Sequence, residues 1–535
     1  MSSIPKVAYF CMEYGLQSDF HTYAGGLGIL AGDFLKEAKD QQVPMVAIGL
    51  KWKQGYVNQR LDEHNYPYDC YKTYDYDHLE ETSIQVDVTI KDQQVTCKVW
   101  KATDFGNVPL YLLDTDVEGN QDKWITAQLY GGYTEQRIAQ EIVLGIGGIR
   151  VLRQLGLEID AYHFNEGHAV FAGLELIREK MCCGDSFEES WRTTKEEIVF
   201  TTHTPIEAGN ESHAIDALCY MGMTSYLSQE QLIRIGGSPF NMTVAALKLS
   251  RKSNAVSELH AETANTMWKG VAGSSSIIPI TNGVHPKTWV DDRMSAAYEA
   301  KQGIWNQHQE LKQELIDYIA DKTGASLSLD TLLLGCCRRM VPYKRNALIF
   351  HDLEVIDPLL KAGKFQIVFS GKAHPLDETG KKVIQHLVTI ADKYPNQVVF
   401  LENYNMEIGH YMTRGVDVWL NSPRIPLEAC GTSGMKAAMN GILNFSTLDG
   451  WWPEACEHGK NGWQFGDGYS TEKIKIVDQR DADSLYAVFN DEVIPTYYDK
   501  RDQWVEMMYA SIESTRERFS TKVMMEKYIE ELYQK

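Results

Sequence analysis

The sequence predicts an α/β protein with two halves, and three observations support this prediction. Short apolar runs alternate with stretches of helical periodicity along most of the chain. A glycine-rich turn at residues 24–28 lies between the first apolar run and the first helical stretch. A second series of the same kind begins after residues 281–286. Alternating strands and helices are typical of a parallel sheet that helices cover on both faces.

The first half is expected to open with a buried strand over residues 7–11, then the glycine turn and a helix over residues 29–41. A strand, a glycine turn and a helix in this order are the usual anatomy of a phosphate-binding α/β unit. The other elements expected here are strands over residues 45–50, 161–165 and 198–202, and a helix over residues 136–155. Alternating residues and turn signals in segment 84–113 predict β-hairpins that decorate this half.

The second half is expected to contain strands over residues 332–336, 366–369, 398–401 and 416–420. Residues 505–534 predict one long amphipathic helix, or two helices that are separated near Phe519 and Ser520. We therefore expect an N-terminal domain over residues 1–290, a C-terminal domain over residues 291–505 and a last helix over residues 506–535. Two α/β halves predict a ligand-binding cleft between domains, at the carboxyl ends of the strands.

Composition excludes several classes of partner. The 535 residues carry 52 basic and 73 acidic side chains, and a formal charge of −21 disfavours nonspecific binding to nucleic acids or anionic membranes. Ten cysteines without a Cys-x-x-Cys motif indicate reduced thiols, and no metal site is predicted. We find neither an N-terminal signal pattern nor an apolar run of membrane-spanning length. A cytoplasmic protein is the expectation.

Four cations follow the strand expected over residues 332–336, namely Arg338, Arg339, Lys344 and Arg345. Guanidinium forks and an ammonium group are suited to binding two closely spaced phosphates. The alternative is an ordinary basic surface patch. The position directly after a strand favours the anion site, because ligands of α/β proteins bind at such ends.

The segment 428–441 combines Glu428 with Lys436 and places two glycines and two hydroxyl side chains just before the lysine. This composition suits a loop that enters a helix, where backbone amides face a ligand. A lysine in that setting can pair with a phosphate or, as a neutral amine, attack an aldehyde. An isolated match of this kind is more often a glycine-rich turn with a surface lysine.

Two histidine-containing segments also follow expected strands. His203 comes after the strand over residues 198–202, and for a lone histidine a structural role and a ligand-binding role are equally supported. Asn165 ends another strand three residues before His168, where the simplest interpretation makes Asn165 a helix N-cap.

Taken in chain order, these segments resemble the glycogen, starch and maltodextrin phosphorylases. Segment 428–441 is similar to the pyridoxal-phosphate lysine segment of that family, and the cation loop is similar to its phosphate-binding stretch. In glucosyltransferases that use nucleotide sugars, two glutamates occupy the places of Glu428 and Lys436. The lysine at the second place favours a phosphorylase over a synthase.

The resemblance implies the GT-B glycosyltransferase fold, in which two Rossmann-like domains face a central cleft and the last helix packs back toward the N-terminal domain. It implies phosphorolysis of terminal α-1,4-linked glucose from a glucan by inorganic phosphate, giving α-D-glucose 1-phosphate with retention. Lys436 would hold pyridoxal 5'-phosphate as a Schiff base, and the cofactor phosphate would shuttle protons. A homodimer is compatible with the resemblance, which involves neither nucleic acid nor membrane.

The resemblance also assigns roles to individual residues. The residues with an implied catalytic role are Arg338, Arg339, Lys344, His203 and Glu428. Those implied in cofactor binding are Lys436, Lys344, Arg338, Gly431, Thr432, Ser433 and Tyr404. Those implied in substrate binding are Gly25, Gly26, Leu27, Asn282, Asn165 and Cys430. The alternatives left open are a nucleotide-sugar-dependent glucan synthase and a catalytically inactive glucan-binding protein.

Two further positions belong to this comparison. Lys372 lies in a segment that matches a phosphorylase motif. Asn405 stands where the animal enzymes carry an arginine near the cofactor phosphate, and this departure bears on cofactor affinity.

Overall fold

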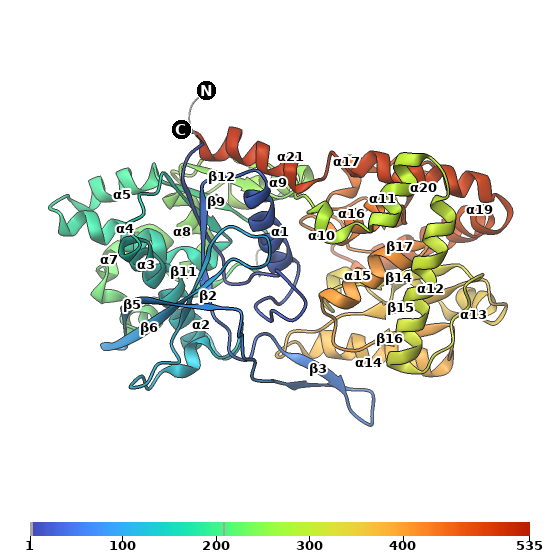
Figure 1. The fold of residues 1–535 in the computed structure, drawn as a ribbon, viewed down its shortest axis with the longest axis horizontal. Helices are drawn as coiled ribbons and strands as arrows, with labels where there is room; N and C mark the ends of the chain where they lie inside the picture. Colours follow the sequence, from blue (N-terminus) through green and yellow to red (C-terminus); the bar gives the residue numbers. More distant parts are fainter. Residues whose placement is uncertain (1–3, 207–208) are drawn as a thin grey trace. The chain divides into compact units, whose positions relative to one another are not determined.

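The computed structural model of the protein divides into two α/β units, each built around its own mainly parallel sheet (Figure 1). It describes residues 4–206 and 209–535. Unit 1 spans Met1–Val57, Tyr71–Thr281 and Thr521–Lys535, and unit 2 spans Asn58–Cys70 and Asn282–Ser520. In the described part of the chain, none of the helices combines the length and apolar character that crossing a membrane requires. The predicted α/β class is therefore confirmed.

Unit 1 contains a nine-stranded sheet whose parallel part is extended by an antiparallel meander. From edge to edge its strands are β13 (Ile277–Pro279), β12 (Lys252–Ala255), β9 (Ile198–Thr201), β8 (Ala161–Asn165), β1 (Val7–Phe10), β2 (Met45–Leu50), β7 (Leu110–Asp114), β6 (Gln93–Ala102) and β5 (Glu80–Ile90). The first strand lies between β2 and β8, with Val7 opposite both Met45 and Ala161. The sheet thus grows in two directions from β1, which creates a topological switch point beside it.

Successive side chains of β1 enter two different cores, as expected for a strand buried on both faces. Phe10 packs with residues of α2 (Thr134–Ile142) and α4 (Phe171–Cys182). Tyr9 packs on the other face, where its ring stacks on Phe34 of α1 (Gly26–Asp40) with 5.1 Å between the ring centroids. The remaining helices of unit 1 are α3 (Gly148–Gln154), α5 (Phe187–Lys195), α6 (Ile215–Tyr220), α7 (Gln229–Gly236), α8 (Met242–Leu249), α9 (Glu258–Trp268) and α21 (Thr521–Lys527).

Unit 2 contains a six-stranded sheet that is parallel throughout. Its order is β16 (Val398–Leu401), β15 (Gln366–Ser370), β14 (Leu333–Cys337), β17 (Val418–Asn421), β18 (Leu443–Thr447) and β19 (Gly462–Phe465). Its helices are α10 (Pro286–Trp289), α11 (Asp292–Ala300), α12 (Ile304–Thr323), α13 (Leu353–Lys361), α14 (Glu378–Lys393), α15 (Met406–Gly415), α16 (Thr432–Met439), α17 (Trp452–Ala455), α18 (Ile474–Val488), α19 (Ile494–Asp499) and α20 (Arg501–Thr515). The switch point of this sheet lies between β14 and β17.

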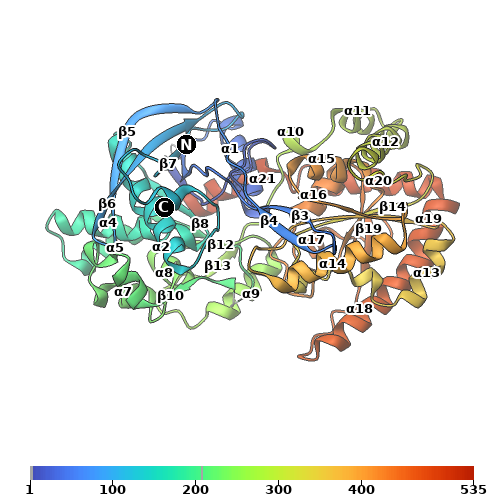
Figure 2. The ribbon, with the colours of Figure 1, turned by 90° about the horizontal axis from the view of Figure 1, so that it is seen from below.

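A hairpin from early in the chain, β3 (Asn58–Leu61) with β4 (Pro67–Cys70), belongs to unit 2 and lies beside α14 (Figure 2). The Gln59 side chain donates to the carbonyl of Ala373 (3.2 Å) and accepts from its amide (2.9 Å). Asp69 forms an ion pair of 2.7 Å with Lys381 of α14. These polar contacts hold the hairpin against the loop that follows β15.

Several expected elements are present with the predicted bounds, and others differ. The strands β2, β8 and β16 match the prediction residue for residue. The expected break near Phe519 separates α20 from α21. The β-hairpins predicted in segment 84–113 are present, because β6 pairs antiparallel with both β5 and β7. They do not decorate the first half but continue its main sheet, since β7 pairs with β2. The helix expected over residues 136–155 contains a π-helical turn at Val143–Gly147 between α2 and α3.

The C-terminal segment is attached to unit 1 by a buried polar network, and Figure 1 shows α21 beside α1. His163 Nδ1 lies 2.8 Å from the Tyr533 hydroxyl, and Nε2 lies 2.8 Å from Thr201 Oγ1. The Arg251 guanidinium donates to the carbonyls of Tyr533 (2.7 Å) and Gln534 (2.9 Å). Burial lowers the pKa of His163 to about 3, so the network is built around a neutral imidazole.

This network predicts a dependence of stability on pH. The folded-state pKa of His163 lies below its unfolded value of about 6.5, so its neutral form contributes stability that decreases as the pH falls below about 6.5. Between pH 6.5 and 5 this residue alone should remove about 2 kcal/mol of unfolding free energy. Urea denaturation of His163→Asn should show a smaller decrease than the wild type. The exposed His64→Asn should behave like the wild type, and an equal decrease in all three proteins would contradict the assignment.

Candidate active site

The site residues of unit 1 lie at the switch point between β1 and β8. The amide of Met12, just after β1, donates to His168 Nε2 at 2.9 Å. The Asn165 side chain, at the end of β8, lies 3.4 Å from Cys11 Sγ. These contacts join the loops that leave two neighbouring parallel strands, which is the usual location of a ligand site in such a sheet.

His203 is held in one orientation by the last residue of β8 and the residue after it. Its Nε2 lies 2.7 Å from Asn165 Oδ1, and its backbone amide donates to Glu166 Oε2 at 2.8 Å. Burial lowers the pKa of His203 well below its usual value, and the neighbouring His260, His163 and His168 add to this effect. The expectation that Asn165 is an N-cap is wrong. The N-cap is Glu166, which accepts from the Gly167 amide at 3.1 Å, while Asn165 orients the His203 ring.

The glycine turn forms the start of α1 and is supported by Glu13, a residue that no sequence pattern singled out. The N-cap of α1 is Gly25, which has no side chain that could cap the helix. Glu13 Oε2 accepts from the amides of Ala24 (2.6 Å) and Gly25 (3.1 Å), and Oε1 accepts from the Tyr130 hydroxyl (2.8 Å). Within the described part of the chain, a Cβ at Gly25 or Gly26 would meet no atom within 4 Å. The turn, which also contains Leu27, is therefore open to a ligand on its outer side.

Glu428 is the centre of the charge cluster in unit 2. Lys344 Nζ lies 3.0 and 2.8 Å from its two carboxylate oxygens, and Arg338 donates to it from Nη2. Burial opposes ionisation of Glu428, but the charges of Lys344 and Arg338 prevail and lower its pKa to about 2. The Nη1 atom of Arg338 is buried without a hydrogen-bond partner among the described residues. A buried guanidinium N–H of this kind keeps a donor available for a bound group, and anions are good acceptors for it.

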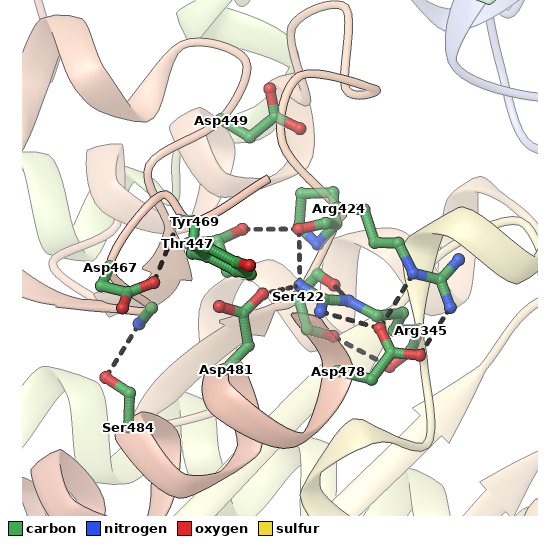
Figure 3. A network of polar contacts seen from close by, with 12 residues as sticks. Arg345, Ser422, Arg424, Thr447, Asp449, Asp467, Tyr469, Asp478, Asp481 and Ser484 are labelled. Atoms are coloured by element: carbon green, nitrogen blue, oxygen red, sulfur yellow. Dashed lines mark hydrogen bonds and ion pairs between the residues drawn. The ribbon is translucent and has the colours of Figure 1, made fainter. Parts of the chain in front are cut away.

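Arg345 has a different role from the other cations of the loop (Figure 3). It donates to the carbonyls of Ser422 (2.8 Å) and Pro423 (2.9 Å) and pairs with Asp478 (3.1 Å) and Asp481 (2.7 Å). The prediction that all four cations form one anion site is therefore wrong for Arg345. Arg345 joins the loops after β14 and β17 to α18. Arg339, which also lies in the loop after β14, is exposed.

Lys436 lies in the last turn of α16 and is 6% exposed. Its Nζ lies 3.6 Å from the centroid of the Trp289 ring, at the end of α10. Gly431 is the N-cap of α16 and has φ +88°, a backbone conformation that favours glycine. No side chain caps this helix, so the first turn, which contains Thr432 and Ser433, is uncapped. Trp289 was missed because a tryptophan after a short turn carries no sequence signal of a site.

Other predicted residues occupy the surrounding loops. The Oδ1 atom of Asn282 is buried without a partner among the described residues, and its backbone amide lies against the buried thiol of Cys430. Asn405 is the N-cap of α15, with Oδ1 accepting from the Ile408 amide at 2.9 Å. Tyr404 immediately precedes this cap. Lys372 donates to Asn403 at 3.3 Å, and burial lowers its pKa to about 8.

The fold and this geometry define an α/β protein whose second unit contains a buried lysine on α16 and a cation cluster centred on Glu428. Residues 290–493 match the model of the carbohydrate phosphorylase family. A maltodextrin phosphorylase of Thermococcus litoralis is 37% identical over 99% of this chain and 70% of its own length. A glycogen phosphorylase of Aquifex aeolicus is 34% identical over 99% of the chain and 86% of its own length. An uncharacterised protein of Methanocaldococcus jannaschii is 34% identical over 98% and 99% of the respective chains.

The chain belongs to the carbohydrate phosphorylase family. Phosphorylases of this family use pyridoxal 5'-phosphate, and the residues present fit that group. A buried lysine amine next to an indole ring suits an aromatic aldehyde. The uncapped start of α16 and the unpartnered Nη1 of Arg338 suit its phosphate.

The different roles of the cations predict different effects of their removal. Arg345→Met should lower the free energy of unfolding by about 3–5 kcal/mol, because it leaves the buried Asp481 carboxylate and the Ser422 carbonyl without their guanidinium partner. Arg339→Met, in the same loop but exposed, should change it by less than about 0.5 kcal/mol. Urea denaturation measures both values. Equal stability of the two variants would show that the Arg345 network does not hold these loops.

Proposed function

We propose that the protein is an α-glucan phosphorylase. It transfers the terminal α-1,4-linked glucose of a glucan to inorganic phosphate and releases α-D-glucose 1-phosphate with retention. The observation that carries this proposal is the position of Lys436, eight residues after Glu428, buried on α16 against Trp289. Membership of the carbohydrate phosphorylase family supports the same reaction.

Lys436 would hold the cofactor, with Arg338, Lys344, Tyr404 and the start of α16 around it. The residues proposed at that start are Gly431, Thr432 and Ser433. When bound, the cofactor supplies a phosphate group whose second pKa of about 6 suits proton donation and acceptance near neutral pH. Asn405 serves as a helix cap, and we assign the charges toward this phosphate to the cation loop.

Arg338, Arg339 and Lys344 would bind the substrate phosphate and stabilise the negative charge near the reacting sugar. Each preorganised cation of this kind contributes about 2–4 kcal/mol to lowering the barrier. Glu428 stays ionised at neutral pH because Lys344 and Arg338 lie against it, so it can accept hydrogen bonds from sugar hydroxyls. The same carboxylate keeps Arg338 and Lys344 together before phosphate binds.

The sugar would be bound by groups that the fold keeps rigid. His203 is neutral and oriented by Asn165, so its ring can exchange a hydrogen bond with a sugar hydroxyl without gaining charge. The amides of Gly25, Gly26 and Leu27, together with Asn282 and Cys430, complete the proposed set.

The GT-B arrangement, with two Rossmann-like domains that face a central cleft, is part of this proposal. The two parallel-rich sheets and the family match support it. Residues 1–290 would bind the glucan, residues 291–505 would bind cofactor and phosphate, and residues 506–535 would return to the N-terminal domain. A homodimer stays a prediction.

Two other functions fit the site less well. A nucleotide-sugar-dependent synthase would use a carboxylate at the place of Lys436, and an ammonium group cannot accept the hydrogen bonds that such a carboxylate makes. A catalytically inactive glucan-binding protein would not need a buried guanidinium N–H that has no partner among the described residues, or a lysine buried against an indole ring.

The choice of donor separates the two enzymes. Incubation of the holoprotein with maltodextrin and glucose 1-phosphate should lengthen the glucan and release inorganic phosphate. UDP-glucose or ADP-glucose should give no growth, because the bound cofactor fills the volume that a nucleotide needs. Chain length and released phosphate are measured for each donor. Growth from a nucleotide sugar, without phosphate release from glucose 1-phosphate, would overturn the proposal in favour of the synthase.

A further inference from the structure

Asp449 follows β18 and is buried, with 1% of its surface exposed. Its Oδ2 accepts a hydrogen bond from the Glu428 amide at 2.9 Å, and its Oδ1 accepts from the Gly450 amide at 2.8 Å. Figure 3 shows its carboxylate apart from the Arg345 network, without a contact to the residues drawn there. Asp449 therefore binds the loop after β17 at the backbone of Glu428, whereas Arg345 binds the same loop at the carbonyls of Ser422 and Pro423.

A second contact joins the same two segments. The Trp451 amide donates to the Cys430 carbonyl at 3.0 Å. Gly450, between Asp449 and Trp451, has φ +60°, and a Cβ there would lie 2.2 Å from the Cys430 carbonyl oxygen. Only glycine allows this close approach. The loop after β18 is thus fastened to the loop that carries Glu428 at two points, two residues apart.

We propose that Asp449 is a positioning residue for Glu428, and that it sets the direction in which the Glu428 carboxylate meets the sugar. This inference rests on the proposed function, because it assigns a task within that reaction. Glu428 is then fixed at both ends. Its backbone amide is bound by Asp449, and its carboxylate is bound by Arg338 and Lys344.

The task requires a carboxylate. Two backbone N–H groups converge on one side chain, and only a group that accepts at both of its terminal atoms can satisfy them. An asparagine would accept one of these bonds and turn its own NH₂ group toward the other N–H. The Glu428 loop would then have to shift, and a shift of about 1 Å at a reacting centre can reduce the rate by about 10²-fold.

The arrangement carries a cost in stability, which supports a functional role. Burial raises the pKa of Asp449 to about 7, and the charge of Glu428 adds to this effect. The amides of Glu428 and Gly450 and the charge of Arg338 act in the opposite direction. Because the folded pKa lies above the unfolded value of about 4, stability decreases as the pH rises from about 4 to 7. A buried charge kept at such a cost next to a ligand site is typical of function.

The test uses the holoenzyme and the isosteric variant Asp449→Asn. Absorbance of the bound cofactor should be unchanged, because Lys436 is not touched. We expect kcat for phosphorolysis of maltodextrin to fall by about 10²-fold. The KM for phosphate should stay within about threefold, because Arg338 and Lys344 are retained. In the wild type, kcat should also decrease as the pH falls below about 7, because the Asp449 carboxylate is then protonated. The variant should lack this decrease.

A double-variant cycle distinguishes positioning from a purely structural role. In the background of Glu428→Gln, Asp449→Asn should reduce kcat by no more than about threefold, because its effect passes through Glu428. The control Asp352→Asn, at an N-cap in unit 2 where the side chain accepts from the Glu354 amide at 2.9 Å, should leave kcat unchanged. If Asp449→Asn does not fold, Asp449→Ser should show the same pattern, since a hydroxyl oxygen keeps one acceptor.

The outcomes are separate from those that test the proposed function. A wild-type protein that catalyses no phosphorolysis would refute the proposed function itself. An active wild type together with an Asp449→Asn variant within threefold of its kcat would overturn the positioning role alone. An equal loss of kcat from Asp449→Asn in the wild-type and Glu428→Gln backgrounds would overturn that role as well.

Discussion

The double ion pair of Glu428 is the interaction on which the rest of the candidate site depends. Its carboxylate joins Arg338 and Lys344, in the loop after β14, to the loop that precedes α16. Two cations close together repel one another, and the Glu428 carboxylate between them offsets this repulsion. The Arg345 network joins the loops after β14 and β17 to α18, and Asp449 binds the backbone amide of Glu428 in the loop after β17. Both sets of contacts help to keep these loops in position.

Much of this arrangement could be predicted because it depends on local patterns. Continuous apolar runs identified β2 and β16 with the observed bounds, since strands buried on both faces show no polar alternation. β8 was also predicted with the observed bounds, although the polar residues His163 and Asn165 interrupt its apolar residues. The cation loop and His203 were found because each follows such a strand. Within each sheet, parallel strands that end at the same edge bring the loops that follow them together, whatever their separation in the sequence.

The residues that escaped prediction are those whose role depends on a distant partner. Arg345 has the same charge as Arg338, and only the position of α18 shows that its guanidinium serves the backbone of another loop. Glu13 supports the glycine turn through backbone amides that no sequence pattern reveals. Asn405 stands where the animal enzymes carry an arginine, and the structure shows that it caps a helix. Trp289 meets Lys436 from a helix almost 150 residues earlier in the chain, and long-range packing of this kind has no local signature.

The claim that Lys436 is the cofactor lysine can be tested most directly by chemical trapping. The purified holoprotein is reduced with borohydride, digested and analysed by mass spectrometry for lysines that carry a pyridoxyl-phosphate group. Lys372 is the informative competitor, because burial lowers its pKa to about 8 and so makes its amine a better nucleophile than an ordinary lysine. We expect modification at Lys436 alone. Modification at Lys372, or at no lysine, would contradict it.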